Sequence, residues 1–163
     1  ATERIFLPLL RLTNPEIVDY HLPEVGVFHN CAIVSIDKQY PKQAMKVMNG
    51  LWGAGLMSLT KLILIVDKTV DVHNYAEVAW QVLGNVDYDR DVLHTTGPVD
   101  HLDHSSYQQF WGGKMGIDAT AKRADEGYTR SWPEVVQQDE AVVQMVTRRW
   151  REYGIGEVFG APR

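Results

Sequence analysis

Two imidazoles and a carboxylate lie within four residues, at His101, Asp103 and His104. Zinc accepts His and Asp ligands, and a catalytic zinc site needs three such ligands around an open position. The flanking residues are typical of a loop, so no helix would place the two imidazoles on one side. We therefore interpret the segment as polar loop groups that face solvent or substrate, and we predict no metal site in the chain.

A glycine-rich segment with a central lysine, Gly112–Gly116, is the second candidate for chemistry. A phosphate-binding loop needs Ser or Thr after its lysine, but Met115 follows Lys114, and Gln108 stands where the first glycine belongs. The segment therefore fails as a Walker loop. Two interpretations remain: an anion nest at Gly113 and Lys114, or a tight turn that needs positive φ, which glycine's ordinary use favours.

The acids and nucleophiles of the chain form no recognisable catalytic set. Asp67 follows the most aliphatic run of the sequence, at the strand end where α/β sheets bind ligands. Neither Asp67 nor Asp118 has an identifiable partner base, although acid–base catalysis needs groups whose pKa values are pushed apart. Cys31 lies in a predicted buried strand, where a thiol is usually inert. No G-x-S-x-G elbow or G-x-G-x-x-G loop is present.

The elements that would position these residues predict an α/β fold with a βαβ-containing sheet flanked by helices. Period-two or continuous apolar runs predict strands at 16–22, 31–36 and 61–66, with a further candidate at 91–94. Apolar residues at three- and four-residue spacings predict helices at 41–52 and after Asn74, where Glu77 completes a capping box. Strand, helix and strand at 31–66 have the size of a βαβ unit.

Residues 95–132 show no sustained period, so we predict a long irregular insert there. A C-terminal helix is predicted at about 134–153, with Gly154 as its stop. The opening segment, residues 2–10, is too short and too interrupted to choose between a helical turn and an extended arm. We expect residues 1–163 to form a single domain.

Composition excludes several classes of protein. The net charge of −5 argues against a nucleic-acid partner and against an anionic membrane surface. The longest aliphatic run, Leu62–Val66, is far shorter than the ~20 residues of a membrane span, and no signal peptide is recognisable. The single cysteine excludes an internal disulfide. These features predict a cytoplasmic protein.

Seven segments match one known family in order along the chain: residues 15–19, 38–40, 47–52, 60–61, 88–91, 98–103 and 114–122. The most specific is Lys114–Lys122, which reads KMGIDATAK. On these segments the chain resembles the C-terminal region of the UbiD-type decarboxylases. These enzymes use prenylated FMN to add or remove CO2 on aromatic or unsaturated carboxylic acids. The resemblance extends to about residue 154.

The resemblance implies that the chemistry lies on other domains. The ligands of prenylated FMN and of its divalent metal, and a Glu-Arg-Glu trio used in proton transfer, belong to the preceding N-terminal and central domains. It therefore implies no catalytic residue in this chain. The residues that match the substrate-pocket loop are Gly97, Pro98 and Val99. Those that match the cofactor-facing segment are Gly55, Leu56 and Met57, and Gly55 replaces a basic residue that many members carry.

The expected function is that of a C-terminal domain that closes one side of the active site and mediates homo-oligomerisation. The N-terminal and central domains would be its partners, and quinone biosynthesis would be its pathway. The isolated chain would be inactive and would bind no cofactor. Two alternatives remain from the residues themselves. One is a stand-alone module that binds a small anion or metal through Lys114 and the His101/His104 loop. The other is a small enzyme that uses Asp67 or Asp118.

Overall fold

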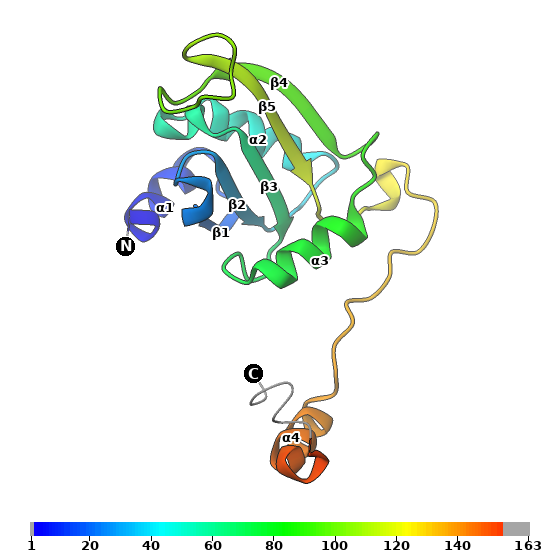
Figure 1. The fold of residues 1–163 in the computed structure, drawn as a ribbon. Helices are drawn as coiled ribbons and strands as arrows, with labels where there is room; N and C mark the ends of the chain where they lie inside the picture. The colour runs from blue at the N-terminus through cyan, green and yellow to red at the C-terminus, as the bar shows by residue number, and fades with distance from the viewer. Residues whose placement is uncertain (1, 155–163) are drawn as a thin grey trace. The chain divides into compact units, whose positions relative to one another are not determined.

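A computed structural model describes residues 2–154 of the chain. The chain divides into two compact units, Ala1–Arg130 and Ser131–Arg163, each of which is described by itself. The single domain expected from the sequence stays a prediction. The first unit contains the sheet and the helices α1, α2 and α3 (Figure 1). No helix within residues 2–154 combines the length and the apolar composition that a membrane crossing requires.

Five strands form one mixed sheet in the order β1-β2-β3-β5-β4. Their bounds are Ile17–His21 for β1, Cys31–Ile36 for β2, Leu62–Asp67 for β3, Val92–Pro98 for β4 and Trp111–Asp118 for β5. The central strands β2, β3 and β5 are parallel, and the two edge strands are antiparallel to their neighbours. The α/β fold is confirmed, and the three strands predicted before residue 70 form within two residues of their expected bounds.

The helices cover both faces of the sheet. On one face, α1 (Thr2–Thr13) and α2 (Gln43–Trp52) pack against alternate strand residues such as Val34 and Ile65. On the other face, α3 (Tyr75–Asn85) packs against Ile33 and Val66. Because both faces are buried, β2 and β3 carry continuous apolar runs rather than alternating ones. The N-terminal segment, for which the sequence did not decide between a helical turn and an extended arm, is the helix α1, and it buries Leu7 and Leu10.

The prediction that residues 95–132 lack regular structure was wrong for the two strands that enter this range. β4 and β5 form an antiparallel ladder that pairs Leu93 with Gly116 and Gly97 with Gly112. The tight turn favoured for Gly112–Gly116 was wrong for the same reason. β5 was missed because its glycines break the apolar alternation. Gly116 is needed because helix α2 lies close, so that a Cβ there would clash with Met48 Sδ.

The helix of the second unit starts later than expected. Helix α4 covers Glu140–Arg149 and is followed by a short 3-10 turn, η4, at Trp150–Tyr153, with Gly154 in the left-handed region as predicted. Asp139 caps α4, because its side chain accepts a hydrogen bond from the Ala141 amide at 2.8 Å. The prediction of helix from residue 134 was therefore wrong for the six residues 134–139, which precede α4 and end with this cap.

Candidate functional site

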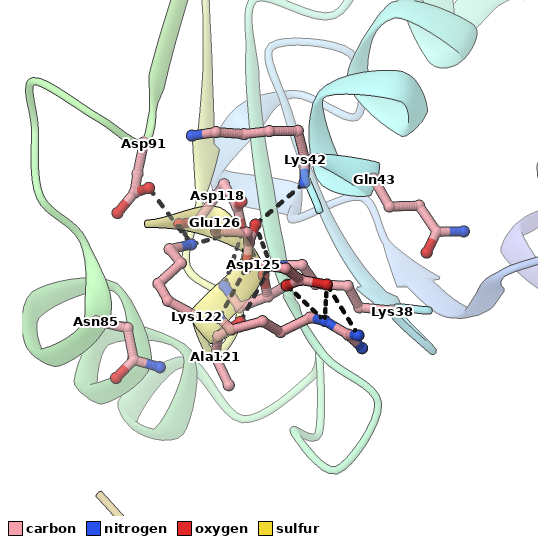
Figure 2. A network of polar contacts seen from close by, with 12 residues as sticks. Lys38, Lys42, Gln43, Asn85, Asp91, Asp118, Ala121, Lys122, Asp125 and Glu126 are labelled. Atoms are coloured by element: carbon pink, nitrogen blue, oxygen red, sulfur yellow. Dashed lines mark hydrogen bonds and ion pairs between the residues drawn. The ribbon is translucent and has the colours of Figure 1, made fainter. Parts of the chain in front are cut away.

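Charged side chains gather at the carboxyl ends of the three parallel strands. Lys38 lies two residues after β2, Asp67 ends β3 and Asp118 ends β5. In open α/β sheets this edge is the usual place for ligands. Figure 2 shows Lys38 and Asp118 with neighbouring residues in a network of polar contacts.

Lys38 and Glu126 form the first half of the network. Lys38 Nζ donates to both carboxylate oxygens of Glu126 at 2.7 Å, and only 5% and 1% of the two side chains are exposed. The amides of Lys42 and Arg123 also donate to Glu126. Burial raises the pKa of Glu126, but the hydrogen bonds from Lys38 and the two amides outweigh burial and hold that pKa below its ordinary value.

Lys122 organises the second half of the network. Its Nζ lies 3.0 Å from Asp118 Oδ1 and 3.5 Å from Asp91 Oδ1, and it donates to the Asp118 carbonyl at 2.9 Å. Arg90 adds two hydrogen bonds to Asp91, at 2.9 and 2.6 Å. Burial lowers the pKa of Lys122, and its two acidic partners oppose that shift. Ion pairs thus link Arg90 to Asp91, Asp91 to Lys122, and Lys122 to Asp118.

Asp67 and Asp118 also serve this edge as hydrogen-bond acceptors. Asp67 Oδ2 accepts from the Ala121 amide at 2.8 Å, and Asp118 Oδ1 accepts from the amide and hydroxyl of Thr120 at 3.0 and 2.5 Å. Burial raises the pKa of Asp67. Both carboxylates therefore fix the turn at 119–122, and the network is best understood as a structural lock between the strand ends and the loop that follows β5.

Lys114 lies away from this edge and performs a different task. The side chain is buried in β5, and its Nζ donates to the carbonyls of Ser58 and Thr60. These carbonyls belong to, or directly follow, the 3-10 turn η2 at Gly55–Leu59. Burial lowers the pKa of Lys114 to about 8. Because the ammonium bonds to protein carbonyls, the predicted anion nest at Gly113 lacks its cation.

Lys114 also joins the two segments that the resemblance assigns to the pocket. Gly97 packs directly on its side chain, since a Cβ there would lie 3.0 Å from Lys114 Cε. Val99 is buried and Pro98 is exposed, at the end of β4. The lysine thus holds η2 and the end of β4 near one another. The sequence gives one signal for this role, a lysine within the most specific family motif, but not the contact itself.

Residues 55–57 line an apolar pocket of about 370 Å³ beside α1. Gly55 has a φ of 48°, which favours glycine, and Leu56 is 79% exposed. Phe6 and Leu9 of α1 line the same pocket and are also exposed. This surface is apolar and offers no charge from residues 55–57.

The His101–His104 loop is organised by Asp103 rather than by its imidazoles. Lys61 Nζ donates to Asp103 at 2.8 Å, and the hydroxyls of Ser105 and Ser106 donate at 2.8 and 2.5 Å. The hydrogen bond from Lys61 is the main reason why the pKa of Asp103 lies well below its usual range. His101 is exposed beside Asp100. Cys31 is half-buried, and burial raises the pKa of its thiol, as expected of an inert cysteine.

The burial of Lys114 predicts a pH dependence of stability. The folded pKa, about 8, lies below the ordinary 10.5, so between these pH values the unfolded chain binds more protons than the folded chain. The free energy of unfolding therefore rises with pH in this window. Relative to Lys114→Met, wild type should gain on the order of 3 kcal/mol between pH 8 and 10.5, measured by urea denaturation. An unchanged difference between the two proteins would contradict the lowered pKa.

Comparison with known proteins shows the family to which the chain belongs. A family model described as the 3-octaprenyl-4-hydroxybenzoate carboxy-lyase C-terminal domain, UbiD_C, matches residues 1–119. An uncharacterized protein of Archaeoglobus fulgidus is 54% identical over 93% of this chain, which spans 32% of that protein. The chain thus covers about a third of the length of this relative.

Two solved structures share the fold. The open form of vanillic acid decarboxylase from Sedimentibacter hydroxybenzoicus has a TM-score of 0.77 and 25% identity, over 93% of this chain and 31% of that one. The UbiD-class enzyme HmfF from Pelotomaculum thermopropionicum, solved with FMN, has a TM-score of 0.68 and 26% identity, over 82% of this chain and 29% of that one. The chain belongs to the UbiD family, in which it corresponds to the C-terminal domain.

Proposed function

We propose that this chain forms one wall of the active site of a UbiD-class carboxy-lyase whose catalytic residues lie on the N-terminal and central domains. The observation that carries the proposal is the position of Lys114. It holds η2 by hydrogen bonds and packs against Gly97, so one buried side chain fixes both segments that the family resemblance assigns to the pocket. A wall built in this way needs no acid, base or nucleophile of its own.

The chemistry of these segments suits a ring better than a phosphate. Residues 55–57 and 97–99 contain no charged side chain, and the exposed members, Gly55, Leu56 and Pro98, are apolar. They fit the face of a flavin or of an aromatic or unsaturated carboxylic acid. Prenylated FMN, its phosphate ligands and its divalent metal would therefore be held by the other domains. When bound, the flavin supplies the group that reacts with the substrate, and a quinone precursor is the substrate that we propose.

Exposed apolar side chains support docking against those domains or a second copy of the chain. Leu12 on α1 and Trp80 on α3 are 80% and 71% exposed. Monomeric proteins rarely leave large apolar patches uncovered. We therefore infer that the chain contributes to a homo-oligomer and that, isolated, it neither binds flavin tightly nor decarboxylates.

A matched pair of variants of the whole protein tests the wall. Leu56 and Leu83 are 79% and 77% exposed in the chain, but only Leu56 lies in the proposed wall. Leu56→Glu places an unpaired charge against the ring and should lower kcat/KM for an aromatic acid about tenfold or more, whereas Leu83→Glu should not.

The isolated chain completes this test. Titrated with prenylated FMN, it should give no saturable quenching of flavin fluorescence and should release no CO2 from the acid. The proposal fails if Leu56→Glu is as active as Leu83→Glu, or if the chain alone turns the substrate over.

A further inference from the structure

Three side chains that can bind a metal converge from distant parts of the first unit. Glu3 lies in the first turn of α1, His21 ends β1, and His73 lies in the loop before α3. One ligand atom of each lies within 4.8 Å of the other two. Among the described residues this is the group with metal-binding spacing, and the His101–His104 loop does not share it.

His21 is held in an orientation that suits a ligand. Its Nδ1 lies 2.7 Å from Glu3 Oε1, and its Nε2 lies 3.0 Å from the Tyr75 hydroxyl. The Leu22 amide donates to the same Glu3 oxygen at 2.6 Å, which holds the carboxylate in place. A hydroxyl partner on one ring nitrogen leaves the other nitrogen for a metal, as in many metal sites where the second nitrogen is hydrogen-bonded. The proton between His21 and Glu3 would then be released to solvent.

His73 has an unprotonated ring nitrogen near the cluster, and an ion that bound it would displace a hydrogen bond from Arg4. Its Nε2 lies 3.4 Å from an Arg4 guanidinium nitrogen, which can only donate, so Nε2 acts as an acceptor there. Arg4 also donates two hydrogen bonds to Asp19, at 2.8 and 3.0 Å, which balances its charge. The ring centroids of His21 and His73 are 4.4 Å apart. Within the cluster itself, the Glu3 carboxylate supplies the negative charge for a cation.

The cluster opens to solvent through a pocket of about 670 Å³. Glu3, His21 and His73 all line it, together with Glu24 and Tyr75. The pocket has room for a hydrated ion to enter and for water to complete the coordination. Side-chain exposures of 21%, 17% and 39% for Glu3, His21 and His73 place the ligands at a partly desolvated wall rather than on a fully open surface.

We propose that Glu3, His21 and His73 bind a zinc-type divalent cation, with the remaining position open to water. Two imidazoles and one carboxylate are a donor set that zinc uses, and imidazole disfavours magnesium and calcium. The ion would tie α1 and the β3–α3 loop to the end of β1, so its binding would stabilise the first unit. This site is independent of the active-site wall proposed above, which lies on η2 and the end of β4.

Calorimetry of the 163-residue chain with Zn²⁺ tests the site, and visible absorption with Co²⁺ reports its ligands. We expect one ion per chain and the absorption of a four-coordinate Co²⁺ site. His73→Ala should weaken Zn²⁺ binding about tenfold to 100-fold. The matched control is His101→Ala, which removes an exposed imidazole outside the cluster, and it should leave the affinity unchanged.

Glu3→Gln guards against a misfolded variant, because its amide oxygen can still accept the hydrogen bond from the Leu22 amide. It should keep the circular dichroism spectrum of wild type and weaken Zn²⁺ binding as His73→Ala does. The proposal is overturned if wild type binds no Zn²⁺, or if His101→Ala weakens binding as much as His73→Ala.

Discussion

We expect Lys38→Met to lower the free energy of unfolding by about 3–5 kcal/mol. The variant leaves the Glu126 carboxylate, which is 1% exposed, without its ammonium partner. Two backbone amides still donate to that carboxylate, but they carry no full charge. A buried ion whose counter-ion is removed keeps its desolvation cost, and this cost is larger than the net value of the pair itself.

Urea denaturation followed by tryptophan fluorescence measures this loss. Lys68→Met is the matched control, because Lys68 pairs with Asp37 at 2.9 Å while 55% and 44% of the side chains are exposed. It should change the free energy of unfolding by no more than about 1 kcal/mol. The double variant Lys38→Met/Glu126→Leu should recover most of the loss, since apolar replacement of a buried pair is often neutral. Equal effects of Lys38→Met and Lys68→Met would show that the lock is not structural.

The central βαβ unit could be predicted from the sequence because its signals are local. The aliphatic runs of β2 and β3 are continuous, and the apolar spacing of α2 fits one helical face. Asn74 likewise caps α3, accepting from the Glu77 amide at 3.4 Å, as its spacing from Glu77 predicts. Each of these elements is determined by residues within a short window.

Strand β5 and the charged lock could not be predicted in this way. β5 contains Gly112, Gly113 and Gly116, and its stability comes from pairing with strands on both sides. The contacts of the lock join residues such as Lys38 and Glu126, which lie far apart in the sequence. Such pairings depend on the tertiary fold, so they cannot be predicted from the hydrophobic period or the local propensity of the sequence.

The candidate wall shows the same division between local pattern and tertiary contact. The family resemblance predicts that residues 55–57 and 97–99 lie near the pocket, yet nothing in their spacing says that they lie together. Lys114 connects the two segments, whereas the sequence around it predicted an anion nest or a tight turn. A buried lysine in a strand is hard to foresee because its partners, the carbonyls of Ser58 and Thr60, are backbone atoms.

The largest expected effect on activity follows from this lysine. In the whole UbiD-class protein, Lys114→Met should lower kcat for an aromatic acid about 100-fold, because a shift of about 1 Å in a positioning element can cost that much. The variant removes the hydrogen bonds that hold η2 and keeps an apolar stem beside Gly97. Under the function proposed above, Lys114 would be a positioning residue, since it bonds to backbone carbonyls.

A stability measurement separates this role from simple unfolding. The loss of two hydrogen bonds to the carbonyls is offset in part because methionine carries no charge to bury, so the free energy of unfolding at pH 7 should change by no more than about 3 kcal/mol. Met115→Leu, one residue along β5, is the matched control and should retain full activity. Hydrogen exchange should show faster amide exchange at 55–59 in Lys114→Met alone. If kcat falls without that local change, or does not fall at all, η2 is not held in place for catalysis by Lys114.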